Sequence, residues 1–185
     1  MPGHRNVHLL IKRADDRSKM VFGEGWHTDS PFLSEPPSIT ILYSVEIPPF
    51  GGDTTWANSA LAYAMRSDTY RQMIDGLKVQ FSLRDVLKSV HEAMVRTHPA
   101  TGERALDVDP TYGIGIEGML PVESAPTLHY LTEHRTQPAF TCRLRWEPDM
   151  LTLWDNRLCV HQAYNHYQGY RRELYRTTVR GEPPV

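Results

Sequence analysis

Cysteine is scarce in this sequence: Cys142 and Cys159 are the only two, and they form neither a CxxC pair nor a disulfide framework. The sequence also lacks an apolar stretch of the roughly 20 residues that a membrane-spanning helix requires. Within residues 1–20, the one apolar run covers residues 9–11, which is too short for the core of a signal peptide. These absences predict a soluble protein of a reducing compartment, which we expect to be the cytoplasm.

An excess of charge of one sign is absent as well, since 20 Lys and Arg residues face 22 Asp and Glu residues. No net field would attract nucleic acid or an anionic membrane surface, so we expect a small-molecule partner instead. Lysine is rare, because 16 of the 20 basic residues are Arg. The planar guanidinium group binds carboxylates and sulfonates through paired hydrogen bonds, which favours an anionic ligand. A compositional bias toward Arg explains the same count equally well.

Short runs of alternating apolar residues are present in several places, and the length of 185 residues predicts one domain over residues 1–185. In residues 38–47 the alternate positions are apolar, which is typical of a half-buried strand. Further strands are predicted at residues 7–12, 53–56, 77–83, 95–98, 105–108, 140–146, 150–154 and 158–163. The last predicted strand, residues 172–180, places Arg172, Leu174 and Arg176 on one face, because side chains alternate along a strand.

Helices are predicted between these strands. Asn58 can cap a first helix, Asp68 can cap a second that ends at Gly76, and the segment up to Met94 is read as helical. A further helix is predicted at residues 124–135, with Pro126 in its first turn. About eight short strands with segregated helices favour a mainly β fold with peripheral helices, either a jelly-roll or a related double-sheet barrel.

His27 and Asp29 lie two residues apart in an extended segment, so both side chains can reach one cation. Such a pair arises easily by chance, and it needs a third ligand before it indicates a metal site. Two His and one carboxylate on one face of an iron form the facial triad of non-haem Fe(II) oxygenases. The third ligand could come from any of several histidines: His91, His98, His129, His134, His161 or His166.

Among these histidines, His161 is distinguished by its place on a predicted strand and by Arg172, which follows eleven residues later. A facial triad leaves positions open for a co-substrate. An Arg in the wall of a barrel is a natural partner for the distal carboxylate of that co-substrate, through charge-assisted hydrogen bonds.

Four blocks occur in order along the chain: GWHTDSPF, PPFGGDTTW, RTHPATGERAL and WDNRLCVHQAYNHYQGYRRELYRTTVRG. Together they resemble the taurine dioxygenase family of Fe(II)- and 2-oxoglutarate-dependent oxygenases, which includes phenoxyacetate and alkyl-sulfate dioxygenases. The resemblance runs from about residue 23 to the end of the chain. It implies the double-stranded β-helix, a jelly-roll of the clavaminate synthase-like type.

The resemblance also implies roles for individual residues. His27, Asp29 and His161 would be the Fe(II) ligands, and Thr54 with Arg172 would hold the far carboxylate of 2-oxoglutarate. Arg176 falls where family members that use sulfonates meet the anionic group of the substrate. The implied reaction consumes O2, converts 2-oxoglutarate to succinate and carbon dioxide, and hydroxylates a small sulfonate, sulfate ester or carboxylate.

Only residues 1–26 precede His27, so the chain is expected to lack part of the usual N-terminal region of the family. An incomplete barrel edge would favour a homo-oligomer. One alternative is a truncated, catalytically silent jelly-roll that binds metal and ligand or serves as an oligomerising remnant. Another is a zinc hydrolase using the same triad, which leaves Thr54 and Arg172 unexplained.

Overall fold

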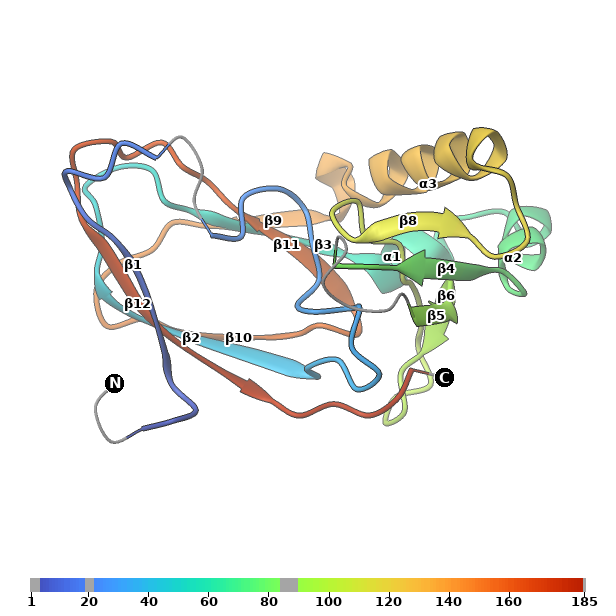
Figure 1. The fold of residues 1–185 in the computed structure, drawn as a ribbon, viewed down its shortest axis with the longest axis horizontal. Helices are drawn as coiled ribbons and strands as arrows, with labels where there is room; N and C mark the ends of the chain where they lie inside the picture. Colours follow the sequence, from blue (N-terminus) through green and yellow to red (C-terminus); the bar gives the residue numbers. More distant parts are fainter. Residues whose placement is uncertain (1–3, 19–21, 84–89, 185) are drawn as a thin grey trace.

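The protein is described from a computed structural model that defines residues 4–18, 22–83 and 90–184. Within these residues, strands from both halves of the chain form two sheets that face each other, and we call this pair of sheets the sandwich (Figure 1). A segment of mixed helices and strands between β3 and β9, called the insert, lies at one end of the sandwich (Figure 1).

The larger sheet of the sandwich has the strand order β1-β12-β2-β10 and is antiparallel throughout. Its strands are β1 (His8–Lys12), β2 (Ile39–Glu46), β10 (Leu151–Asp155) and β12 (Arg172–Val179). Strand β12 occupies the middle of the sheet beside β1 and β2, and its register shifts between Glu173 and Leu174. The C-terminal strand is thereby held against the first strand of the chain.

The smaller sheet has the order β11-β3-β9, with β3 (Thr54–Asn58), β9 (Thr141–Leu144) and β11 (Cys159–Ala163). The segment before His27 adds to its edge through isolated bridges, which pair Glu24 with Ala163 and His27 with His161. Apolar side chains from both sheets meet between them, chiefly Leu42, Trp56, Trp146, Trp154 and Leu174.

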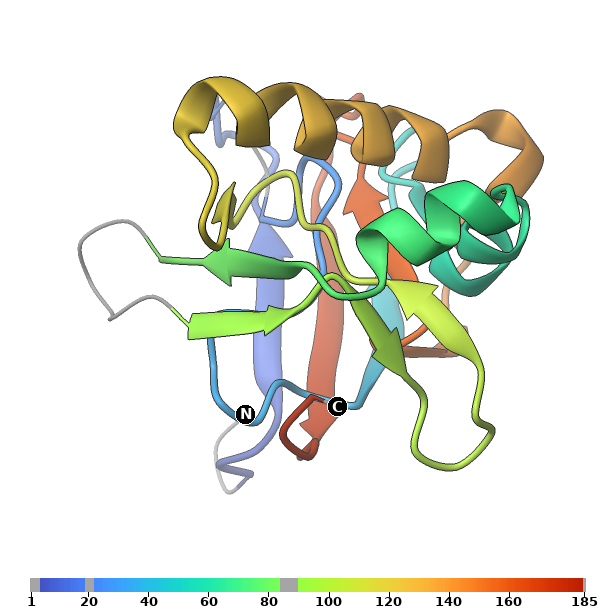
Figure 2. The same cartoon turned by 90° about the vertical axis from the view of Figure 1, so that its right-hand side faces the viewer.

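The described residues of the insert include three helices: α1 (Ser59–Ala64), α2 (Asp68–Ile74) and α3 (Pro121–Arg135). Its strands are β4 (Lys78–Phe81), β5 (Val90–Ala93), β6 (Val95–Thr97), β7 (Arg104–Leu106) and β8 (Gly113–Ile116). They pair as β5-β4-β8 and β6-β7; α1 packs on β7, and α3 lies across β8 and α1 (Figure 2). The short 3-10 helix η1 (Pro138–Phe140) leads back into the sandwich.

The predicted strand at residues 38–47 is confirmed, but its orientation differs from what its apolar pattern suggests. Thr40, Leu42 and Ser44 are buried, whereas the apolar face that includes Ile39 and Ile41 is only half-buried. The inward face of β2 is polar because it borders the candidate site described below.

Three predictions about the insert are wrong in detail. Residues 90–93 form β5 rather than a helix, because they pair with β4; residues 84–89 lie outside the described residues. Helix α2 is capped by the Ser67 side chain, not by Asp68. Helix α3 begins at Pro121, where the Glu123 carboxylate accepts a hydrogen bond from the Leu120 N–H, so Pro126 lies beyond the first turn.

None of the described helices is both long enough and apolar enough to cross a membrane.

Candidate metal centre

The backbone brings His27 and His161 together across the edge of the smaller sheet. The His27 N–H donates to the His161 carbonyl, the His161 N–H donates to the His27 carbonyl, and both N···O distances are 2.9 Å. Residues that exchange both hydrogen bonds lie directly opposite each other on neighbouring strands. The two imidazole rings therefore lie side by side, with their centroids 4.2 Å apart.

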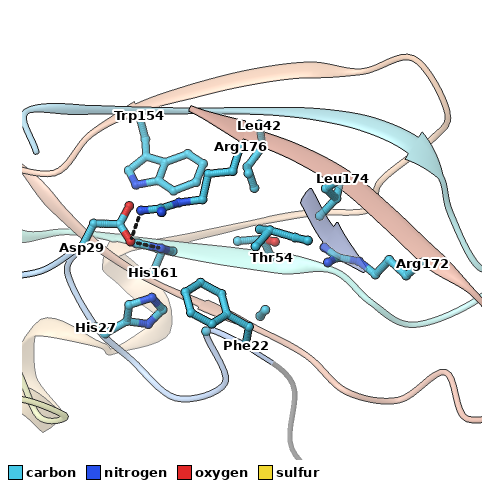
Figure 3. Close-up of a pocket in the computed structure, with 13 residues that line it drawn as sticks. Phe22, His27, Asp29, Leu42, Thr54, Trp154, His161, Arg172, Leu174 and Arg176 are labelled. Atoms are coloured by element: carbon cyan, nitrogen blue, oxygen red, sulfur yellow. Dashed lines mark ion pairs between the residues drawn. The ribbon is translucent and has the colours of Figure 1, made fainter. Parts of the chain in front are cut away.

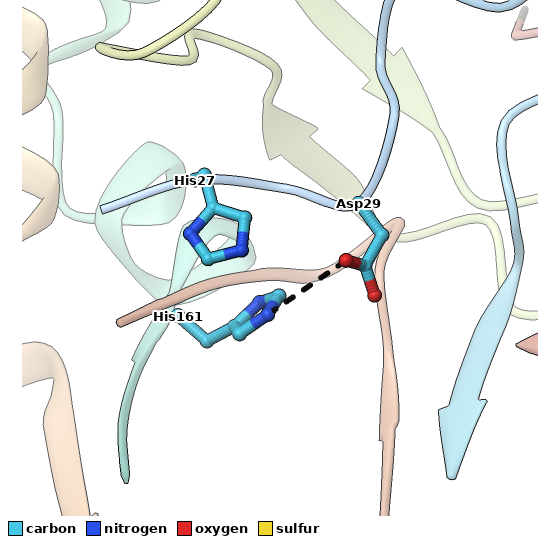
Figure 4. Close-up of side chains that lie close together, drawn as sticks. All are labelled: His27, Asp29 and His161. Carbon is cyan, nitrogen blue, oxygen red and sulfur yellow. Dashed lines mark ion pairs between the residues drawn. The ribbon is translucent and has the colours of Figure 1, made fainter. Parts of the chain in front are cut away.

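Asp29, two residues beyond His27, completes a cluster of three buried side chains (Figure 4). One ligand atom from each of the three lies within 4.8 Å of the others, and His161 Nε2 is 4.0 Å from Asp29 Oδ1. Elsewhere in the described part of the chain, no three His, Cys, Asp or Glu side chains come as close together. The predicted set of His27, Asp29 and His161 is the one that the fold assembles.

The other histidines considered as a third ligand lie elsewhere. His98 Nε2 is 3.0 Å from Asp155, His134 Nε2 is 2.8 Å from the Ala62 carbonyl, and His91 Nδ1 is 2.9 Å from Glu117. His129 is exposed beside Glu133, and the ring of His166 lies near that of Tyr164. These contacts are structural, and they leave His161 as the histidine that faces the His27 and Asp29 pair.

The two histidines are in a state suited to bind a cation. His27 Nδ1 lies 2.9 Å from the Gly25 carbonyl, which can only accept, so Nδ1 carries the proton and Nε2 is free to act as a ligand. Burial, together with the neighbouring His27, lowers the pKa of His161 to about 3. His161 is therefore neutral at physiological pH, as metal binding requires. Its Nδ1 is buried and has no hydrogen-bond partner among the described residues.

Asp29 is held as a carboxylate. Burial alone would raise the pKa of Asp29. The Arg176 guanidinium and the Thr40 hydroxyl oppose burial, and the pKa of Asp29 falls below its ordinary value. Two imidazoles and one carboxylate, with one ligand atom of each within 4.8 Å of the others, fit a divalent transition metal such as Fe(II).

Thr54 and Arg172 line the cavity onto which this cluster opens (Figure 3). The Trp146 indole N–H donates to the Thr54 hydroxyl at 3.0 Å. Because the indole can only donate, it occupies a lone pair of Thr54 and leaves the hydroxyl proton free for an acceptor in the cavity.

The surroundings of the Arg172 guanidinium disfavour its charged form. Burial lowers its pKa, although Tyr167 and Asp53 oppose this, and its Nε is buried without a hydrogen-bond partner among the described residues. Gly52 has a φ of +70°, and a Cβ there would lie 3.1 Å from Arg172 Cδ and Nε. The site thus keeps room around a buried cation that lacks an anionic partner, which suits a bound carboxylate.

Arg176 lies on the same face of β12 as Arg172 and Leu174, as the sequence predicts, and all three line the cavity. Its Nη2 is 2.8 Å from Asp29 Oδ1, and its side chain is 17% exposed (Figure 3). Arg176 therefore contacts a member of the candidate metal centre directly.

Comparisons with known proteins agree with this geometry. The family model described as taurine catabolism dioxygenase TauD, TfdA family matches residues 3–178. The chain belongs to this family.

Two curated relatives are similar over most of the chain. An alpha-ketoglutarate-dependent sulfate ester dioxygenase of Pseudomonas putida is 33% identical over 183 residues, which cover 86% of this chain and 60% of the relative. An alpha-ketoglutarate-dependent 2,4-dichlorophenoxyacetate dioxygenase of Burkholderia sp. (strain RASC) is 30% identical over 196 residues, covering 95% and 66%.

A crystal structure of a taurine dioxygenase from Burkholderia xenovorans matches with a TM-score of 0.91 and 40% identity, over 100% of this chain and 68% of that one. The mainly β fold with few helices is therefore that of TauD-type dioxygenases. The chain spans about two thirds of the length of these relatives.

The sequence does not point to Asp109, yet this residue joins the insert to the candidate metal centre of this TauD, TfdA family member. The buried Asp109 carboxylate accepts hydrogen bonds from the backbone N–H of Thr28, at 2.5 Å, and of Thr111, at 2.7 Å. Thr28 lies between His27 and Asp29, and the Thr111 hydroxyl donates to the Trp26 carbonyl at 2.9 Å. No local pattern in the sequence links residues 109 and 28, because the contact depends on the position of the insert.

Proposed function

We propose that this chain is a non-haem Fe(II)- and 2-oxoglutarate-dependent dioxygenase that hydroxylates a small anionic organic molecule and releases succinate and carbon dioxide. One observation carries the proposal. The cluster of His27, Asp29 and His161 opens on the same cavity as Thr54 and Arg172; the Thr54 hydroxyl proton and the unpartnered Arg172 Nε suit a carboxylate.

We assign the facing sheets to the double-stranded β-helix, or jelly-roll, and treat residues 1–185 as one catalytic domain. The assignment draws on the strand orders β1-β12-β2-β10 and β11-β3-β9 and on the similarity to a taurine dioxygenase. In this arrangement the ligands come from the edge of one sheet and the arginines from the middle of the other.

His27, Asp29 and His161 would hold Fe(II), which with bound 2-oxoglutarate and O2 supplies the oxidising power for C–H hydroxylation. Arg172 would neutralise the distal carboxylate of 2-oxoglutarate, and the Thr54 hydroxyl would donate to the same group. Thr54 and the Nε of Arg172 are buried, so contacts of these groups with the carboxylate would be made away from competing water. These two residues orient the co-substrate and leave the triad to hold the metal.

Arg176 is the proposed contact for the anionic group of the primary substrate. One nitrogen of its guanidinium faces Asp29, and the remaining N–H groups can donate to a sulfate, sulfonate or carboxylate. The relatives act on a sulfate ester and on a phenoxyacetate, both of which are anionic. A small organic sulfonate, sulfate ester or carboxylate is therefore the proposed substrate class.

The first test is binding without turnover. Under anaerobic conditions, the chain is expected to bind Fe(II) and then 2-oxoglutarate, with both measured by calorimetry. His161→Ala should abolish metal binding without unfolding the protein, which circular dichroism would check. Absence of Fe(II) and 2-oxoglutarate binding by the unaltered chain would refute the proposal.

The second test is turnover. We expect oxygen consumption and succinate formation to depend on both Fe(II) and 2-oxoglutarate in a screen of sulfonates, sulfate esters and phenoxyacetates. Arg176→Gln should raise the KM for the active substrate, with Fe(II) affinity measured in parallel because Arg176 also contacts Asp29. If the chain binds metal and co-substrate but consumes no oxygen with any compound of the screen, the alternative of a catalytically silent jelly-roll is favoured.

A further inference from the structure

A chain of buried hydrogen bonds leads from the end of β10 to Asp29. The Trp154 indole N–H donates to Asn156 Oδ1 at 2.9 Å, and Asn156 Nδ2 donates to Thr40 Oγ1 at 2.8 Å. The Thr40 hydroxyl then donates to Asp29 Oδ2. Asp29 is thus reached from β2 and β10 of the larger sheet as well as from its own loop.

For each of these three hydrogen bonds, chemistry fixes which group donates and which accepts. The Trp154 indole nitrogen can only donate, so the Asn156 atom that faces it must be the amide oxygen. The Asn156 NH2 group is then turned to Thr40, whose hydroxyl must accept this bond. The single Thr40 proton remains for Asp29, which as a carboxylate can only accept.

The sheet register holds these side chains in place. Trp154 and Thr40 are Cα partners in the pairing of β10 with β2. The backbone N–H of Asn156 donates to the Ser38 carbonyl at 2.8 Å, which fixes the turn that follows β10. Thr40 is 0% exposed and Asn156 is 4% exposed, so water does not compete for their hydrogen bonds.

We propose that Thr40 and Asn156 are positioning residues that select which oxygen of Asp29 faces the metal, an inference that rests on the metal site of the proposed function. The Thr40 hydroxyl occupies Oδ2, whereas Oδ1 faces His161 Nε2 at 4.0 Å and the Arg176 guanidinium at 2.8 Å. A carboxylate held in this way offers one oxygen rather than two. It therefore leaves more of the metal's positions open for 2-oxoglutarate and O2.

Outer partners that hydrogen-bond a ligating carboxylate typically change metal affinity by about 10- to 100-fold when they are removed. Thr40→Val removes the hydroxyl but keeps the shape of the side chain, and it should weaken Mn(II) binding to the metal-free chain by that factor. Thr40→Ser keeps the hydroxyl but loses a methyl group, and it should bind Mn(II) within about threefold of the unaltered chain.

The order of these two variants separates positioning from packing. If Thr40 served only to fill space, Thr40→Val would retain Mn(II) affinity better than Thr40→Ser. Thr55→Val is the matched control, because Thr55 is buried in the smaller sheet and its hydroxyl lies 3.4 Å from the Tyr164 hydroxyl, away from Asp29. It should leave the Mn(II) dissociation constant unchanged.

Asn156→Leu gives an independent measurement should Thr40→Val not fold. It removes the donor to Thr40, and a smaller loss of Mn(II) affinity than for Thr40→Val is expected. In the double variant the two losses should not add, because Asn156 acts on Asp29 only through Thr40.

The closing experiment is calorimetric titration of Mn(II) into the unaltered chain and these variants, with thermal unfolding of each metal-free protein as a check on folding. Weaker Mn(II) binding by Thr40→Val, together with near-normal binding by Thr40→Ser, supports the proposed positioning role. If the unaltered chain, Thr40→Val and Asn156→Leu bind Mn(II) equally, the positioning role is overturned and the proposed function remains intact. Failure of the unaltered chain to bind Mn(II) overturns the metal site itself.

Discussion

The interior of the insert and the interior of the sandwich differ in chemistry. The insert has the larger apolar cluster, which includes Ile74, Phe81, Met94 and Leu131, each of which is 0% exposed, and it also buries charged side chains such as Asp107 and Arg135. The sandwich has a smaller apolar cluster, rich in Trp, and beside it a set of buried polar side chains: His27, Asp29, Thr40, Thr54, His161 and Asn156.

This difference separates stability from chemistry within one chain. Burial of apolar side chains stabilises a fold directly, whereas buried polar groups are tolerated only when hydrogen bonds or bound ligands satisfy them. Among the described residues of the sandwich, three buried side-chain atoms lack hydrogen-bond partners: His161 Nδ1 and Arg172 Nε belong to residues that line the candidate site, and the third is Trp56 Nε1. The larger apolar cluster of the insert can therefore stabilise the fold, while the candidate site in the sandwich keeps polar groups available to bind ligands.

The largest expected change in stability comes from the insert. Leu131→Ala should lower the free energy of unfolding by about 2–5 kcal/mol, because it leaves a cavity in the apolar cluster. Chemical denaturation would measure the loss, and Leu120→Ala, at an exposed position, is the matched control. Mn(II) affinity of the folded protein should not change; a parallel loss of affinity would contradict the separation of roles.

Arg172, in the sandwich, is expected to contribute to ligand binding and not to stability. Arg172→Met should weaken 2-oxoglutarate binding by about 1.5–3 kcal/mol, the contribution of hydrogen bonds to a charged group. Since this variant removes a buried charge with an unpartnered Nε, the ligand-free protein should unfold at the same or a higher temperature. Calorimetry and thermal unfolding would check the two results, and a clear loss of stability would mean that Arg172 is a structural residue.

Asp109 tests the connection between the two regions. Asp109→Ala leaves the buried N–H of Thr28 without its acceptor, which should cost about 1–3 kcal/mol of stability. Because Thr28 lies between two metal ligands, Mn(II) affinity should fall together with stability. Asp109→Asn keeps an acceptor oxygen and should retain more of both, whereas an unchanged affinity in Asp109→Ala would show that the two regions act independently.

The smallest effect is a pH dependence within the insert. Burial lowers the pKa of His134 below 6.5, although its hydrogen bond to the Ala62 carbonyl opposes the shift. As the pH falls below 6.5, the unfolded chain takes up a proton before the folded protein does, so stability decreases. His134→Gln should reduce the drop in melting temperature between pH 7.5 and 5.5, and an identical drop would exclude this contribution.

Predictions from local patterns succeeded where the pattern reflects chemistry within a few residues. The Asn58 cap of α1 is confirmed, with its side chain accepting from the Leu61 N–H at 2.8 Å. The shared face of Arg172, Leu174 and Arg176 is confirmed by the cavity that they line. The helix expected up to Met94 failed, because pairing with β4 determines the conformation of residues 90–93.

The sequence by itself determined the kinds of donor available and their spacing: an imidazole and a carboxylate two residues apart, and arginines at alternate positions of a strand. Only the tertiary structure decided which of several histidines joins His27 and Asp29. It also decided that Thr40, Asn156 and Asp109 hold the segment that carries this pair. The reason is physical. Contacts between segments 81 to 134 residues apart set those positions, and they depend on strand register, hydrogen bonds and packing that no local pattern encodes.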